Sequence, residues 1–148
     1  MPIAEFLAVF LAVFGAAIVE IWGAVPVGLA LGLPAPAIWV AAVAGALISV
    51  SVVAIGGDAV RAWIVRRRGQ RTLAGQGRLY RIWLRWGVVG WGLISPLVFA
   101  PPMGTAIAVA LGAPRGRLLA SMVAGVLLWV TILVAAGEGG LALLRGLH

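Results

Sequence analysis

Glu20 is the residue whose type and surroundings point most directly to chemistry, because it lies between two long apolar stretches. Residues 6–19 precede it without a charge, and Ile21-Trp22-Gly23-Ala24-Val25-Pro26 follows it. An ionised side chain near the centre of a bilayer costs about 2.5–3.5 kcal/mol on insertion scales, and desolvation there favours the neutral carboxyl. We therefore expect Glu20 to carry a proton or to balance the charge of a cation. The alternative is that it lies at the outer interface and only ends the first helix.

Prolines, glycines and hydroxyls in the apolar stretches are the remaining candidate site residues. Where proline removes a backbone donor, small and polar residues can shape a cavity. The residues expected around such a cavity, with Glu20, are Pro26, Gly28, Ser95, Pro96, Pro101, Pro102, Gly104 and Thr105. We expect Ser95 and Thr105 to satisfy backbone groups freed at the breaks; the alternative is that they bind a substrate headgroup.

The inventory of reactive residues argues against an enzyme. The chain has no Cys and one His, the terminal His148, so it has no metal-ligating cluster. It also has no nucleophile with a base at workable spacing and no phosphate-binding glycine motif after a strand. We expect no catalytic residue, no metal and no cofactor.

The composition indicates an integral membrane protein. Of 148 residues, 64% are hydrophobic and 10% charged, with a mean hydropathy of +1.16. Soluble domains carry about 25% charged residues, so a soluble globular protein and a disordered chain are both excluded. The net charge of +7 arises from eleven arginines against four acids. Because the arginines are concentrated in one stretch, we interpret them as determinants of topology and lipid contact rather than of nucleic-acid binding.

The elements that must position these residues follow from the charge-free stretches 6–19, 21–57, 86–114 and 118–137. A spanning helix needs about 20 apolar residues. We predict an all-α polytopic membrane protein with three full spans, at about 3–19, 36–57 and 116–137. Two segments, about 20–34 and 87–113, are interrupted by proline and glycine and are predicted to be broken or re-entrant.

Eight arginines lie between Arg61 and Arg85, and this stretch should be cytoplasmic. The same rule places the N-terminus inside. Following a polar connector, a helix is predicted to lie at the membrane surface, its aromatic residues at headgroup depth and its guanidinium groups on lipid phosphates. The residues expected at this lipid interface are Arg78, Arg81, Arg85, Trp83 and Trp86. The alternative is that the stretch is only a cytoplasmic anchor.

An internal repeat relates residues 32–58 to 112–138 at a shift of 80. Eight positions are identical, including Gly32 with Gly112 and Gly45 with Gly125. Two unrelated Ala/Val/Gly helices are the alternative explanation. The chain is divided accordingly into repeat 1 (about 15–58), an arginine-rich connector (59–86), repeat 2 (about 87–138) and a short tail (139–148). Because bases follow only the second Gly-x-Pro, the charges predict that the two copies cross in opposite directions, as in an inverted-topology repeat. Gly45 and Gly125 should allow close helix packing.

Two segments resemble a known family. EIWGAVPVGLALGLP (20–34) and GLISPLVFAPPMGTAIAVALGAPRGRLLA (92–120) are similar to the bacterial family of small multi-drug export proteins, and the resemblance covers about residues 15–137. That family is distantly similar to the DedA/VTT membrane proteins. The resemblance implies two facing re-entrant hairpins and, for some members of the wider group, movement of lipids and coupling to protons.

These observations predict a small multi-pass transporter of the bacterial inner membrane that exports small molecules or drugs by alternating access, with proton coupling through Glu20. One alternative is a DedA-like lipid flippase or scramblase; another is a membrane scaffold that transports nothing. The expected partners are membrane lipids and a small-molecule or lipid substrate, with no nucleic acid. A bundle of this size is compatible with a homodimer.

Overall fold

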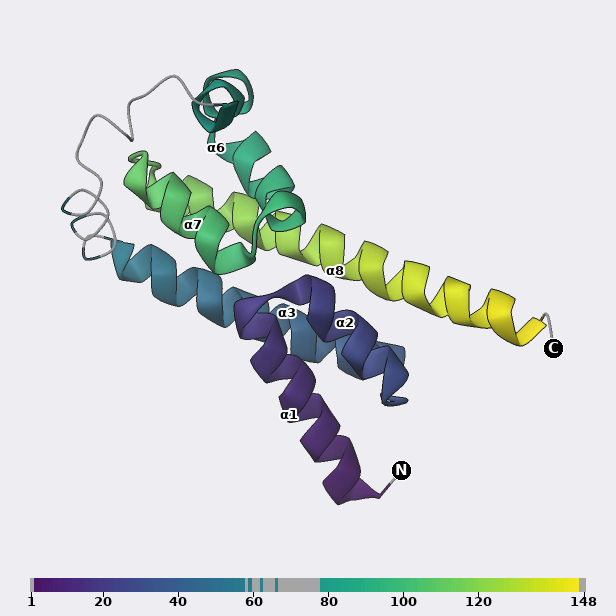
Figure 1. The fold of residues 1–148 in the computed structure, drawn as a ribbon. Coiled ribbons are helices and arrows are strands. Elements are labelled where there is room, and N and C mark those ends of the chain that lie inside the picture. Colours follow the sequence, from purple (N-terminus) through teal and green to yellow (C-terminus); the bar gives the residue numbers. More distant parts are fainter. Residues whose placement is uncertain (1, 58, 60–61, 63–65, 67–77, 147–148) are drawn as a thin grey trace. The chain divides into compact units, whose positions relative to one another are not determined.

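The computed structural model describes residues 2–57, 59, 62, 66 and 78–146, and within them the chain forms helices and no strand. This confirms the predicted all-helical class. The helices are α1 (Ile3–Val19), α2 (Ile21–Ala30), α3 (Ala35–Ile55), α6 (Arg78–Val98), α7 (Pro101–Ala110) and α8 (Arg115–Gly146) (Figure 1).

Two of the described helices are long and apolar enough to cross a membrane, judged by length and composition. They are α3 and the Arg115–Gly140 part of α8, close to the predicted spans 36–57 and 116–137. The third predicted span, α1, has 17 residues. At 1.5 Å per residue it is about 26 Å long, shorter than the roughly 30 Å of a hydrocarbon core.

The chain divides into two compact units. Unit 1 is Met1–Ile48 with Leu127–His148, and unit 2 is Ser49–Val126. Unit 1 therefore holds α1, α2, the first part of α3 and the last part of α8. Unit 2 holds α6, α7, the first part of α8 and the last part of α3. Each unit thus contains two helices of its own, α1 and α2 or α6 and α7, and one part each of α3 and α8.

The core of unit 1 lies where α1, α2 and α3 meet. Val13 and Ala17 of α1, Ile21 and Val25 of α2, and Ile38 of α3 are almost fully buried there. The chain turns sharply between α1 and α2, so that the apolar faces of both short helices face the same core (Figure 1).

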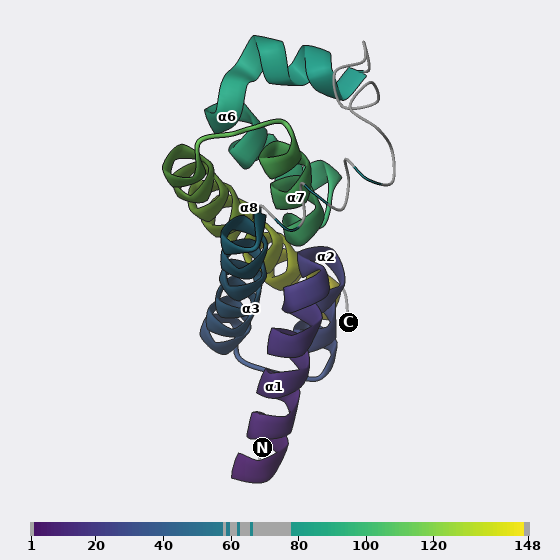
Figure 2. The same cartoon turned by 90° about the vertical axis from the view of Figure 1, so that its left-hand side faces the viewer.

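The core of unit 2 is a cluster of apolar side chains from α3, α6, α7 and α8. It includes Val50, Trp91, Ala108, Leu118 and Met122. α6 bends at Gly87, where φ is 62° and ψ is −167°, and Figure 2 shows its ribbon changing direction. A positive φ is accessible to glycine because glycine has no Cβ.

The turn before each long helix is built in the same way. Gly32 has a φ of 75° and Gly112 a φ of 81°. In the first turn the Gly32 N–H donates to Leu29 O (3.1 Å) and the Leu33 N–H donates to Gly28 O (3.0 Å). This pair of hydrogen bonds is a Schellman motif, which ends a helix at a left-handed residue. The same two bonds form 80 residues later.

Burial recurs at the same spacing. α2 buries residues 21, 24, 25 and 28; α7 buries the equivalent residues 101, 104, 105 and 108 and, in addition, 109 and 110. α3 buries 38, 41, 42, 46 and 50, and α8 buries 118, 121, 122, 126 and 130. From residue 21 onward, positions 80 residues apart therefore share both their turn conformation and many of their buried residues.

Within unit 1 the pieces of α3 and α8 run in opposite directions. A Cβ on Gly137 would meet the side chain of Leu29, which lies just before the turn into α3. Farther along α3, Trp39 Nε1 donates to Thr131 Oγ1 at 2.9 Å. The part of α3 in unit 1 is therefore antiparallel to the part of α8 that it contacts.

Unit 2 contains the reciprocal pair of contacts. A Cβ on Gly57 would lie 2.7 Å from Val109 Cγ1, and Val109 lies just before the turn into α8. Val50, earlier in α3, shares the core cluster with Leu118 and Met122, which lie farther along α8. The two helix pieces are again antiparallel.

Two of the predicted proline breaks are wrong, since Pro26 lies inside α2 and Pro96 inside α6. Each proline removes one backbone donor, and a membrane helix tolerates this loss where neighbouring groups compensate. The helices are interrupted at Glu20, at 99–100, at 31–34 and at 111–114; the last two hold glycine and proline residues at which the sequence predicts an interruption. The predicted tail 139–148 is also largely helical, because α8 continues to Gly146.

Several predictions fall outside the described residues. They concern Asp58, the last residue of repeat 1, and four of the eight arginines of the connector 59–86, namely Arg61, Arg67, Arg68 and Arg71. The backbone of 78–86 is helical, as expected for the surface helix. The side chains of Arg78, Arg81, Arg85, Trp83 and Trp86 are outside the description.

Candidate functional site

Glu20 is the single residue that joins α1 to α2. Its backbone is extended, with φ −156° and ψ 132°, and its N–H donates to Ala16 O as the last hydrogen bond of α1. The side chain is exposed and makes no cap hydrogen bond to α2. The carboxyl group therefore projects from the bend instead of serving the backbone of either helix.

The end of α1 is pressed against the middle of α3. A Cβ on Gly45 would lie 3.0 Å from Ala17 Cβ and 3.2 Å from Ile18 N, and nearer still to Phe14 O. Only a residue without a Cβ permits this approach, so the predicted close packing at Gly45 is present. Since Glu20 follows Ile18 by two residues, this contact fixes the level of the bend along α3.

Of the other two expected residues in unit 1, Gly28 is buried and Pro26 is exposed. A Cβ on Gly28 would lie 2.8 Å from Ile38 Cγ1 and 3.1 Å from Val13 Cγ2. Gly28 thus lets α2 fit between α1 and α3, and it does not line the bend at Glu20.

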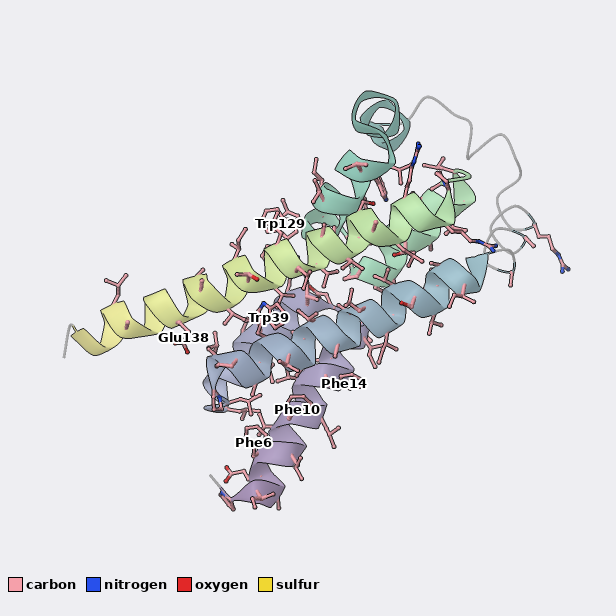
Figure 3. The ribbon with its side chains drawn as sticks, turned by 180° about the vertical axis from the view of Figure 1, so that it is seen from behind. Phe6, Phe10, Phe14, Trp39, Trp129 and Glu138 are labelled. Carbon is pink, nitrogen blue, oxygen red and sulfur yellow. The ribbon has the colours of Figure 1, made fainter. Side chains whose placement is uncertain are left out.

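α1 presents a row of aromatic rings along part of its surface. Phe6, Phe10 and Phe14 follow one another at four-residue spacing (Figure 3) and are half-buried. The rings of Phe6 and Phe10 are stacked, with centroids 6.3 Å apart and an interplanar angle of 22°. These rings contact one another along α1, and none of them is a polar group that could interact with Glu20.

The expected residues of unit 2 lie together in its interior. Pro96 and Pro101 are fully buried, as is Thr105. A Cβ on Gly104 would lie 2.8 Å from Ser95 Oγ, so α6 and α7 touch at these two residues. Pro102 is half-buried beside them on the first turn of α7, where proline is well tolerated.

The two hydroxyls expected at the site have protein partners. Ser95 Oγ donates to Met122 Sδ at 3.3 Å, and Thr105 Oγ1 donates to Pro101 O at 2.8 Å. Thr105 thus bonds to the carbonyl one turn earlier in its own helix, and this carbonyl is not one of the groups freed at a break. Ser95 faces a thioether, which is a weak acceptor.

Two residues of this interior were missed by sequence reasoning. Trp91 Nε1 donates to Gly104 O at 3.0 Å, and its ring stacks on Phe99 with centroids 6.0 Å apart. Ser121 Oγ lies within hydrogen-bond distance of Val88 O (3.1 Å) and is also bonded within α8. No local pattern distinguishes Trp91 from the other tryptophans, because its partner is chosen by how α6 meets α7.

The link between α6 and α7 differs chemically from the link between α1 and α2. It has two residues, Phe99 and Ala100, where the first link has only Glu20. Phe99 packs against the core of unit 2. An acid therefore links α1 to α2, whereas the link between α6 and α7 has no charged residue.

Among the residues that the structure describes, no three His, Cys, Asp or Glu side chains gather as a metal site. In that same part of the chain every buried side-chain nitrogen or oxygen has a hydrogen-bond partner. The Glu20 carboxyl is the group at the candidate site that can take up a proton or pair with a cation. No known protein family, curated protein or solved structure matches this chain.

Proposed function

We propose that the chain is an integral membrane transporter of two inverted repeats, in which Glu20 exchanges a proton as substrate moves. The first support is the surface of α3. Its exposed side chains are apolar and include Val40, Ile48, Val52 and Ile55, whereas Ser49 is buried. A helix facing water has the opposite arrangement, so this surface fits a lipid environment.

The inverted arrangement is supported by the reciprocal contacts of the two units. If α3 and α8 both cross the bilayer, their antiparallel pieces require that they cross in opposite directions. Each repeat then enters through the same kind of Gly-x-Pro turn from opposite sides, which is the construction of many secondary transporters. The concentration of arginine after α3 favours a cytoplasmic connector. The bacterial inner membrane is proposed on the resemblance of the sequence to a bacterial family.

The contact at Gly45 is the observation that carries the proposal. α3 has 21 residues, so it is about 31 Å long and matches a hydrocarbon core. Gly45 is its eleventh residue, about 15 Å from either end. The last turn of α1 touches Gly45, which supports a position for Glu20 near the middle of the bilayer. On this basis we favour two full spans, with α1 reaching the middle, over the three spans predicted.

A carboxyl group at that depth is costly when charged and unpaired, and it is stable when protonated or paired with a cation. Switching between these two states as the bend faces one side and then the other would couple substrate movement to protons. The bend is a suitable element for such a change, because Glu20 is the only residue between two helices.

The test is transport by the full chain in proteoliposomes under an imposed pH gradient. Ethidium, Nile red and a fluorescent phosphatidylethanolamine serve as cationic, neutral and lipid probes. We expect gradient-driven movement of at least one soluble probe, its loss in Glu20→Gln, and its retention in Glu138→Gln, which changes an exposed acid near the end of α8. Unchanged transport by Glu20→Gln would refute the role of Glu20. Lipid movement indifferent to the gradient would favour the lipid flippase or scramblase instead.

A further inference from the structure

We infer that α1 and α2 form a hairpin inserted from the outer face of the membrane, so that α1 begins outside and its exposed surface binds the acyl chains of outer-leaflet lipids. The outer face is the one opposite the arginine-rich connector. This inference rests on the part of the proposed function that places α3 across the bilayer. It reverses the orientation expected from the sequence, which counts two crossings before the connector where the proposed function leaves one.

α1 and α2 run in opposite directions on either side of the bend at Glu20. A Cβ on Gly28 would lie 3.1 Å from Val13 Cγ2. Val13 precedes the bend by seven residues, and Gly28 follows it by eight. If α2 continued in the direction of α1, these two residues would be about 22 Å apart at 1.5 Å per residue. The chain therefore folds back at the bend, as Figures 1 and 2 show, and the two helices are the arms of a hairpin.

Two contacts with α3 fix the direction of α1. The Cβ position of Gly28 is also 2.8 Å from Ile38 Cγ1, near the start of α3. The last turn of α1 instead meets Gly45, farther along α3. α1 therefore advances toward its bend in the direction in which α3 runs from Ile38 to Gly45. Because the proposed function has α3 run from the outer face to the connector, α1 also begins at the outer face.

Unit 2 repeats this arrangement between α6 and α8. Ser121 Oγ lies 3.1 Å from Val88 O, and a Cβ on Gly125 would lie 3.2 Å from Leu93 Cα. The second part of α6 thus advances with α8, as α1 advances with α3. Since α8 crosses in the opposite direction to α3 in the proposed function, the hairpin of α6 and α7 enters from the connector's face. Two hairpins inserted from opposite faces are consistent with an inverted repeat.

The lengths of the two arms fit one half of a bilayer. α2 has ten residues and is about 15 Å long, half of a hydrocarbon core of roughly 30 Å. Glu5 lies about 22 Å before Glu20 along α1, so even at a tilt of about 40° it reaches the level of the headgroups. Glu5 is the only charged residue of α1, and this position leaves it in contact with water.

The first half of α1 exposes large apolar side chains. Ile3 is 81% exposed, Leu7 51% and Leu11 61%, and the first buried residue of α1 is Val9. Leu11 lies about 14 Å and Leu7 about 20 Å from the bend along the helix axis. With the bend near the middle of the bilayer, both residues fall between that middle and the outer headgroups. The apolar medium at this depth is the acyl chains of the outer leaflet, so these chains are the partner of this surface.

The experiment uses single cysteines in the full chain, which has no native cysteine. Pro2→Cys, Ala62→Cys and Gly146→Cys change exposed residues before α1, in the connector and at the end of α8. In spheroplasts, a membrane-impermeant maleimide should label Pro2→Cys and Gly146→Cys completely, and Ala62→Cys only after permeabilisation. To test lipid contact, bimane on Leu11→Cys should lose fluorescence in bilayers of brominated phosphatidylcholine, whereas bimane on Gly146→Cys should not.

Labelling of Pro2→Cys only after permeabilisation, with Gly146→Cys still labelled from outside, would overturn the inference, because α1 would begin inside. The proposed transporter would then still stand on its own transport test. Bimane on Leu11→Cys that is not quenched would show that α1 is not among lipids, and labelling of Ala62→Cys alone would show that the hairpin enters from the other face. If Ala62→Cys and Gly146→Cys are labelled from the same side, α8 does not cross, and the inverted repeat fails together with the inference.

Discussion

Adding one methyl group at Gly45 should separate α1 from α3. The Cβ of Gly45→Ala would fall on the backbone of α1, close to Phe14 O and 3.2 Å from Ile18 N. Backbone atoms cannot rotate away as a side chain can, so the helices must move apart. Overpacking of this kind costs about 1–3 kcal/mol, and the better helix propensity of alanine returns up to about 1 kcal/mol. We expect a net destabilisation of up to about 2 kcal/mol, combining these two terms.

The matched control is Gly15→Ala, on the same helix as Phe14. Nothing lies within 4 Å of a Cβ at Gly15, so only the propensity gain of about 0.5–1 kcal/mol applies there. The assay is denaturant unfolding of the full chain in mild detergent, followed by far-UV circular dichroism. The two variants should therefore shift the midpoint in opposite directions. If Gly45→Ala is as stable as Gly15→Ala, α1 does not meet the middle of α3, and the placement of Glu20 loses its basis.

Gly125, which lies 80 residues after Gly45, allows an independent check. A Cβ on Gly125 would meet Gly92 O and would lie 3.2 Å from Leu93 Cα. Gly125→Ala should destabilise the chain by a similar amount, whereas Gly116→Ala, with open space around its Cβ, should not. An effect at Gly45 without one at Gly125 would contradict a shared packing scheme in the two repeats.

Three further predictions concern the turns, the interior of unit 2 and the depth of the bend. Gly112→Ala forces a residue with a Cβ to adopt a φ of 81°, and should lower the unfolding free energy by about 1–2 kcal/mol in the same assay. Trp91→Phe removes the hydrogen bond to Gly104 O and should cost about 1–3 kcal/mol; an unchanged midpoint would show that this bond is dispensable. Spin labels on Val19→Cys and Ile48→Cys, both exposed in a chain without native cysteine, should report similar depth by oxygen accessibility in bilayers. A label at Val19 that is accessible to water-soluble nickel would place the bend at the interface.

Part of the candidate site is readable from the sequence because its causes are local. Glu20 is recognisable as an acid in an apolar setting, and the Gly-x-Pro pattern predicts both turns that precede the long helices. Proline was a poorer guide. The sequence predicts breaks at Pro26 and Pro96, yet the helices continue through them, since one lost donor does not end a helix whose other bonds and packing remain.

The sequence by itself determined the helical class, the apolar character of the long helices and the interruptions near Gly32 and Gly112, since these depend on composition and on a few adjacent residues. Only the tertiary structure decided that α1 ends against Gly45 and that Trp91 bonds to Gly104. It also decided that the last part of α3 belongs to unit 2 and the last part of α8 to unit 1. Such contacts join residues far apart in the chain, and they depend on which apolar faces fit together most closely.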